Sequence, residues 1–205
     1  MDKTHIVKDL YNTIERMAEG FYSEKRSRFL SFALPVRSTE EVKEVVARLR
    51  KQYHDARHVC WAYSLGVEEE CRVWDDGEPS STAGKPILGQ IRAAGISDVI
   101  VIVVRYFGGV ELGTGGLSAA YRRAAADALS HAQAVPRTVD TGFTLTCAYE
   151  DLDRVLKVIR ESGASLQECL TDTRCRLQVS IRINGSDTLQ RQLKSLGSVL
   201  FIPQP

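Results

Sequence analysis

The stretch DVIVIVVRYFGGVELGTGGLSAAYRR, residues 98–123, decides how the chain folds. It starts with an unbroken apolar run from Val99 to Val104, which is typical of a β-strand buried on both faces. A loop containing five glycines follows, and an alanine-rich segment that predicts a helix closes the stretch. Because glycine loses much conformational entropy on folding, this clustering indicates a backbone that turns tightly or lies close to another group. The five are Gly108, Gly109, Gly113, Gly115 and Gly116.

Length and composition place the chain among globular proteins with a packed core. Its 205 residues suit two domains of modest size, and 43% of them are hydrophobic. No apolar stretch approaches the roughly 20 residues that span a membrane, and the N-terminal residues lack the apolar core of a secretory signal. We therefore expect a cytoplasmic protein with no membrane partner. Because the net charge is only +1, any contact with nucleic acid must come from a local patch.

The first domain is predicted over residues 1–134. Strand-like residues at 11–35 indicate a hairpin with a break near Glu19–Gly20. A capping box formed by Ser38 and Glu41 opens a helix that ends near Tyr53. Further strands and a helix that begins near Gly84 and Pro86 lead to the opening stretch.

The second domain is predicted over residues 138–205, after a linker at Pro136. Periodicity gives the order strand, helix, strand, strand, helix, strand, with Asn184–Gly185 closing the hairpin and Ser186 or Asp187 capping the last helix. This order is that of a ferredoxin-like domain in an α+β protein. It contains no glycine-rich loop and no clustered acids, which favours a binding role over catalysis.

Polar side chains gather in two places ahead of the glycine loop. His54 and His58 are four residues apart, but the helix ends before them, so shared metal ligation is disfavoured. The loop 75–82 is rich in acids and can either bind a cation or serve as a capped surface turn. A helix starting near Gly115 would present free N–H groups to an anion, although the glycine spacing matches no nucleotide motif.

The five cysteines show no zinc or redox spacing. Cys169 and Cys175 flank a predicted turn and could face each other across a hairpin, as a regulatory disulfide or as reduced thiols. Reduced thiols are favoured by the expected compartment.

Three motifs, HDARHVCWAY, DDGEPSSTAGKPIL and VVRYFGGVELGTGGLSAAYRRA, resemble the IMPACT family in its bacterial, YigZ-type form. The resemblance implies a first domain like domain IV of elongation factor G and a second like its C-terminal domain. It also implies an association with translation, through the ribosome, RNA or a translation factor, and it gives no enzymatic activity, catalytic residue or cofactor to carry over. Eukaryotic relatives carry an extra N-terminal domain for a kinase pathway, and this chain does not show it.

Two functional hypotheses remain beside a purely structural role for the loops. The first is a non-enzymatic, translation-associated regulator. The second is an enzyme or binder of a small phosphate ligand or nucleotide, with Mg²⁺ held by the acidic loop and His58 as base. The first takes the basic residues as phosphate contacts, and the second takes the acids, the glycine-loop amides and His58. Together the candidate residues are Arg28, Arg57, His58, Asp75, Asp76, Glu78, Lys85, Arg105, Tyr106, Gly108, Gly109, Gly113, Gly115, Gly116, Tyr121 and Arg122, with Arg123 as a further phosphate contact.

Overall fold

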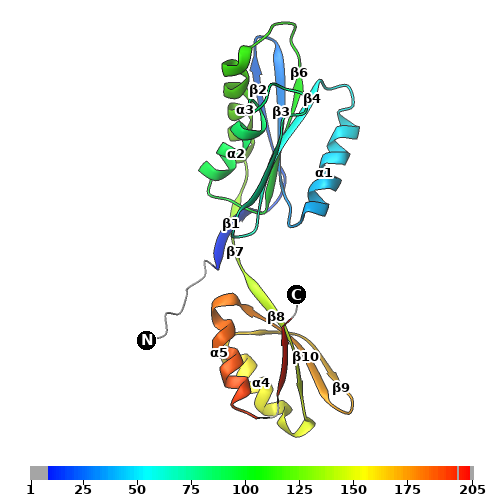
Figure 1. Cartoon of the computed structure of the whole chain (residues 1–205), viewed down its shortest axis with the longest axis vertical. Coiled ribbons are helices and arrows are strands. Elements are labelled where there is room, and N and C mark those ends of the chain that lie inside the picture. The colour runs from blue at the N-terminus through cyan, green and yellow to red at the C-terminus, as the bar shows by residue number, and fades with distance from the viewer. Residues whose placement is uncertain (1–8, 198, 204–205) are drawn as a thin grey trace. The chain divides into compact units, whose positions relative to one another are not determined.

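The computed structural model describes residues 9–197 and 199–203, and Figure 1 shows its two units. One unit is Tyr11–Arg137, and the other contains Asp9, Leu10 and the described residues from Thr138 onward. Helices and antiparallel sheets occur in both, which confirms the α+β class. The sequence placed all N-terminal residues in the first domain. Asp9 instead belongs to the second unit, because its carbonyl oxygen accepts a hydrogen bond from the Val139 amide.

An antiparallel sheet of five strands forms the centre of the first unit, in the order β2-β3-β6-β4-β5. The central strand β6 (Val99–Tyr106) pairs with β3 (Ser27–Pro35) and with β4 (His58–Leu65). The edges are β2 (Ala18–Glu24) and β5 (Glu70–Trp74). All six side chains from position 99 to 104 are 0% exposed, so the prediction of a strand buried on both faces is confirmed.

Helices cover both faces of this sheet (Figure 1). α1 (Thr39–Gln52) packs on one face, whereas α2 (Gly84–Ala93) and α3 (Gly113–Ser130) pack on the other. The predicted start of α1 is confirmed, because the Ser38 hydroxyl accepts a hydrogen bond from the Glu41 amide at 3.2 Å. Alternation along β6 therefore sends odd-numbered side chains toward α2 and α3 and even-numbered ones toward α1.

The predicted break near Glu19–Gly20 is wrong. Both residues lie inside β2, and the chain turns at Lys25–Arg26 between β2 and β3. Gly20 permits close packing instead, because a Cβ there would lie 2.3 Å from the backbone nitrogen of Ala128 in α3. The residues before this hairpin form β1 (Leu10–Ile14), which pairs with β7 (Ala134–Thr138) in a separate two-stranded sheet.

The second unit contains a four-stranded antiparallel sheet with two helices on one face (Figure 1). Its strand order is β11-β8-β10-β9, and apolar side chains of the helices and strands form one core. The chain order is β8 (Asp140–Cys147), the 3₁₀ turn η1 (Tyr149–Asp151), α4 (Leu152–Glu161), β9 (Ser165–Thr171), β10 (Cys175–Arg182), α5 (Ile183–Lys194) and β11 (Leu200–Pro203).

Two local predictions for the second unit are wrong. Asn184–Gly185 does not close the hairpin, because α5 begins at Ile183 and includes both residues. The expectation that Cys169 and Cys175 face each other is also wrong, since Cys175 is opposite Thr171 in the register and Leu177 is opposite Cys169. All five cysteines are free thiols.

Candidate functional site

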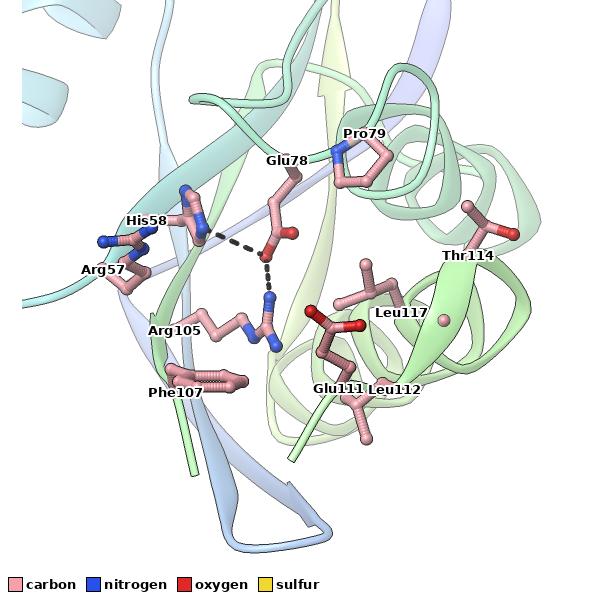
Figure 2. Close-up of a pocket in the computed structure, with 11 residues that line it drawn as sticks. Arg57, His58, Glu78, Pro79, Arg105, Phe107, Glu111, Leu112, Thr114 and Leu117 are labelled. Carbon is pink, nitrogen blue, oxygen red and sulfur yellow. Dashed lines mark hydrogen bonds and ion pairs between the residues drawn. The ribbon is translucent and has the colours of Figure 1, made fainter. Parts of the chain in front are cut away.

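The acidic loop and the glycine loop border one pocket at the end of the five-stranded sheet (Figure 2). The cavity has a volume of about 560 Å³. Its lining comes from the start of β4, the loop after β5, the end of β6 and the first turns of α3. The lining residues are Arg57, His58, Glu78, Pro79, Arg105, Phe107, Glu111, Leu112, Gly113, Thr114 and Leu117.

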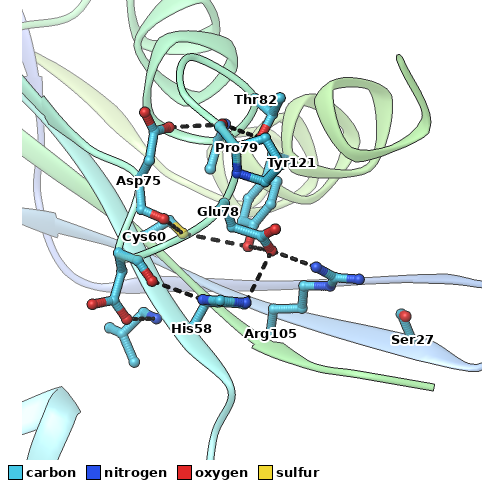
Figure 3. A network of polar contacts seen from close by, with 12 residues as sticks. Ser27, His58, Cys60, Asp75, Glu78, Pro79, Thr82, Arg105 and Tyr121 are labelled. Atoms are coloured by element: carbon cyan, nitrogen blue, oxygen red, sulfur yellow. Dashed lines mark hydrogen bonds and ion pairs between the residues drawn. The ribbon is translucent and has the colours of Figure 1, made fainter. Parts of the chain in front are cut away.

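A buried carboxylate organises the polar side of this pocket (Figure 3). Glu78 is 8% exposed, and its Oε1 accepts hydrogen bonds from Arg105 Nη1 at 2.5 Å and from the Tyr121 hydroxyl at 2.7 Å. Cys60 Sγ donates to the same hydroxyl at 3.3 Å. Burial raises the pKa of Tyr121, and the neighbouring Cys60 and Glu78 raise it further. The phenol therefore stays protonated and serves as a donor to Glu78.

Arg105 is held in place by aromatic rings as well as by this carboxylate. Its guanidinium carbon lies 5.6 Å from the centre of the Phe29 ring and 5.7 Å from that of Phe107. The residue is 5% exposed, yet its Nε has no hydrogen-bond partner among the described residues. A buried guanidinium N–H without a partner is costly, so this atom marks a position where an acceptor would bind favourably.

His58 faces the same carboxylate from β4. Its Nδ1 lies 2.7 Å from the carbonyl oxygen of Asp76, which can only accept, so Nδ1 carries a proton. In the neutral ring Nε2 is then unprotonated, and it lies 3.8 Å from Glu78 Oε1. This geometry supports a direct ion pair with Glu78 only when the imidazole is doubly protonated.

Asp75 and Asp76 stabilise the loop rather than point into the pocket. Asp75 accepts hydrogen bonds from the amides of Ser81, Ala83 and Gly84 at 2.8, 3.1 and 2.8 Å, which anchors the start of α2. Asp76 Oδ2 accepts from the Val59 amide at 2.7 Å and from the Arg50 guanidinium at 2.6 Å. Within the described residues no group of three His, Cys, Asp or Glu side chains is placed to hold a metal ion.

Some predicted basic residues lie outside the pocket. Arg28 lies on the α1 face of the sheet, with its guanidinium 5.0 Å from the centre of the Tyr106 ring, whereas Arg105 faces α3. Lys85 is exposed in the first turn of α2 and does not line the cavity. On α3, Arg122 is exposed and Arg123 donates to the Tyr22 hydroxyl at 2.5 Å.

The glycines of the loop have different roles. Gly108 allows close packing, because a Cβ there would lie 2.2 Å from the carbonyl carbon of Arg26. Gly109 and Gly113 adopt φ values of +83° and +69°, which side chains rarely adopt. Gly115 has no atom within 4 Å of an added Cβ, and Gly116 packs against Leu112.

Sequence reasoning identified Arg57, His58, Glu78, Arg105 and Gly113 as part of this region, and the structure brings all five to the pocket. It missed the remaining lining residues on the loop and on α3. A polar residue directly before the predicted helix start at Gly115 was the available signal for Thr114. The apolar members had no signal that distinguished them from core residues.

The fold and the site define an α+β unit with a pocket at the end of its central sheet. Comparison with known proteins gives the family. The family model of the Impact N-terminal domain matches residues 25–129. The chain belongs to the IMPACT family and is of the bacterial, YigZ-type form.

Three relatives show how far the similarity extends. IMPACT family member YigZ of Escherichia coli strain K12 is 39% identical over 131 residues, which cover 62% of this chain and 64% of that protein. YvyE of Bacillus subtilis strain 168 is 33% identical over 77% of this chain and 73% of its own length. Protein IMPACT of Xenopus laevis is 34% identical over 44% of this chain and 30% of its own length.

Solved structures support the fold over nearly the whole chain. The crystal structure of a hypothetical protein superposes with a TM-score of 0.74 at 27% identity and covers 97% of this chain and 99% of its own. A second crystal structure, of a protein from Thermus thermophilus, gives a TM-score of 0.50 at 12% identity, over 97% of this chain and 29% of its own. The second likeness concerns the fold alone. No helix within residues 9–197 and 199–203 is long and apolar enough to cross a membrane.

Proposed function

We propose that this chain is a non-enzymatic, translation-associated regulator whose first unit contacts the ribosome, RNA or a ribosome-bound partner, with RNA phosphates as the groups it touches. Membership of the IMPACT family supports the association with translation. One observation carries the contact with RNA: exposed arginines from two separate segments, residues 26–28 and residue 57, gather at one end of the five-stranded sheet, beside the pocket.

The sheet register brings these arginines together. Arg28 in β3 is paired with Tyr106 at the end of β6, and the Arg57 amide donates to the Arg105 carbonyl oxygen at 3.0 Å. The backbone of Arg26 lies against Gly108 in the loop that follows β6. Arg26, Arg28 and Arg57 are all exposed, so their guanidinium groups are available to phosphate oxygens.

The turn between β2 and β3 adds a further basic element to this end. Lys25 and Arg26 adopt φ values of 44° and 64°, a conformation that is uncommon for residues other than glycine. A two-residue hairpin turn with both φ values positive normally favours Asn-Gly. Lys25 and Arg26 are exposed and occupy positions that cost turn stability, which supports a functional role for their positive charges.

The finer fold assignments are part of this proposal. The order from β8 to β11, with α4 and α5 on one face of the sheet, supports a ferredoxin-like second unit. We also propose that the first unit resembles domain IV of elongation factor G and that the second unit resembles its C-terminal domain. Cytoplasmic localisation and the absence of a catalytic reaction belong to the same proposal.

The alternative is an enzyme or binder of a nucleotide that uses Mg²⁺ at the acidic loop. The pocket and its buried Glu78–Arg105 pair favour a small ligand. The Mg²⁺ part has less support, because the carboxylates of Asp75 and Asp76 already accept hydrogen bonds from the loop backbone and from β4.

Binding to ribosomes and to single-stranded RNA tests the proposal when it is measured across a range of salt concentrations. The double variant Arg28→Gln, Arg57→Gln should lower the slope of log K against log salt by about 1.4, which is two contacts at about 0.7 each. The matched control is Arg92→Gln with Arg160→Gln, which removes the same charge from exposed positions on α2 and α4. Binding without salt dependence, or equal weakening in both double variants, would contradict the proposal.

A further inference from the structure

The pocket holds an unused donor from a buried cation. Arg105 is 5% exposed, and Figure 2 shows its guanidinium extending from β6 toward Leu117 and the start of α3. Nη1 is bonded to Glu78, whereas Nε has no partner among the described residues. Nε and a neighbouring amino nitrogen of arginine can together donate to two oxygens of one phosphate or carboxylate.

The N-terminus of α3 opens on the same cavity. Gly113 and Thr114 line it, and no side chain among the described residues caps this 18-residue helix. The first turn contains no acidic residue. The first N–H groups of a helix have no partner within it, and the helix dipole places partial positive charge there. Two independent features, one from β6 and one from α3, therefore favour an anion in the cavity.

We propose that this pocket binds the phosphate monoester of a nucleotide, either free or at the end of an RNA strand. Because Arg105 lies at the bottom of the pocket, a terminal phosphate can reach it, whereas a continuous backbone that crosses the surface meets Arg57 first. A cavity of about 560 Å³ is large enough for a nucleotide. Phe107 is 50% exposed at its wall and offers a ring face to the base. Binding of a phosphate at the end of an RNA strand rests on the proposed function, whereas binding of a free nucleotide does not.

One acidic residue at the cavity should weaken the binding of a phosphate, so its removal gives a second prediction. Two arginines and two glutamates line the cavity, namely Arg57, Arg105, Glu78 and Glu111, with His58 Nε2 3.8 Å from Glu78 Oε1. The charge of Glu78 is balanced by its hydrogen bonds from Arg105 and Tyr121. Glu111 is exposed and repels an incoming phosphate. Glu111→Gln should therefore tighten binding of a nucleoside monophosphate by about two- to fivefold.

The central test uses Thr114→Glu in the full chain, with Thr114→Gln as the control of equal size. Thr114 is exposed in the first turn of α3, where a carboxylate stabilises a helix, so the variant should fold. Calorimetric titration would compare adenosine 5′-monophosphate with adenosine, and a 5′-phosphorylated RNA oligomer with its 5′-hydroxyl form. We expect the phosphate to strengthen binding by about tenfold or more, Thr114→Glu to remove that gain and Thr114→Gln to keep it.

The outcomes separate this inference from the proposed function. If the 5′-hydroxyl RNA binds as tightly as the phosphorylated RNA and the monophosphate binds no better than adenosine, the pocket inference is overturned while RNA binding stands. If the monophosphate binds and neither RNA does, the inference holds for a free nucleotide and the RNA contact fails. Preference for the phosphorylated RNA alone supports a strand end as the ligand. If the phosphate still strengthens binding in the Thr114→Glu variant, the phosphate does not bind at the start of α3 and the inference is overturned.

Discussion

Replacing Tyr121 with phenylalanine tests whether the buried network stabilises the first unit. Tyr121 is 0% exposed, and its hydroxyl donates to Glu78 at 2.7 Å. Its ring packs edge-on against Phe29 with 5.2 Å between centroids, a contact that phenylalanine retains. The change therefore removes the weak hydrogen bond that the hydroxyl accepts from Cys60 Sγ at 3.3 Å, together with one hydrogen bond to a buried carboxylate. Such bonds contribute about 1.5–3 kcal/mol, so the free energy of unfolding should fall by about that amount.

The assay is urea unfolding followed by tryptophan fluorescence. Both tryptophans, Trp61 and Trp74, lie in the first unit, so the signal reports on that unit alone. Tyr149→Phe is the matched control, because Tyr149 is 74% exposed in the second unit and should leave the transition unchanged. A loss below about 0.5 kcal/mol for Tyr121→Phe would refute the reasoning, since it would mean that Glu78 does not depend on this donor.

Gly20→Ala should destabilise the first unit by about 1–3 kcal/mol, because the added Cβ would lie 2.3 Å from the backbone of α3. Gly89→Ala is the control and should stabilise the unit, because an added Cβ on α2 meets no atom within 4 Å. Equal effects of the two changes in urea unfolding would contradict this prediction. Ser38→Ala should cost about 0.5–2 kcal/mol through loss of the α1 cap in the same assay, and an unchanged midpoint would contradict the cap. In thiol labelling of the native chain at neutral pH, exposed Cys169 should react first. Cys147 should resist until unfolding, because burial and the neighbouring Cys175 raise its pKa to about 11. The folded chain keeps the Cys147 thiol proton to a higher pH than the unfolded chain does, so the free energy of unfolding should fall as the pH rises above 9.0, the ordinary pKa of a cysteine. A free energy of unfolding that stays constant between pH 9 and pH 11 would contradict this prediction.

Features that depend on local periodicity could be predicted from the sequence. The run from Val99 to Val104 has apolar residues at every position, which indicates burial on both faces wherever the strand lies in the sheet. The cap of α1 requires only Ser38 and Glu41, three residues apart. The prediction at Gly20 was wrong, because a glycine that ends a strand cannot be distinguished in sequence from a glycine inside a strand that lets a helix pack closely against it.

Features that depend on strand register could not be predicted. Arg28 and Arg105 look equivalent in sequence as basic residues beside apolar runs, but β3 pairs Phe29 with Arg105, which puts Arg28 on the opposite face. The acidic loop posed a similar problem. Whether Asp75 binds a cation or backbone amides depends on how the loop folds back onto the start of α2, and its hydrogen bonds to residues six to nine positions later show the second outcome.

Hydrogen exchange of the chain with and without ribosomes tests the central claim most directly. If the first unit contacts RNA through the basic sheet end, amides at 24–28, 57–58 and 105–114 should gain protection, and the gain should disappear at high salt. The second unit should show no comparable change. Protection confined to the second unit, or protection of the first unit that is insensitive to salt, would contradict the account.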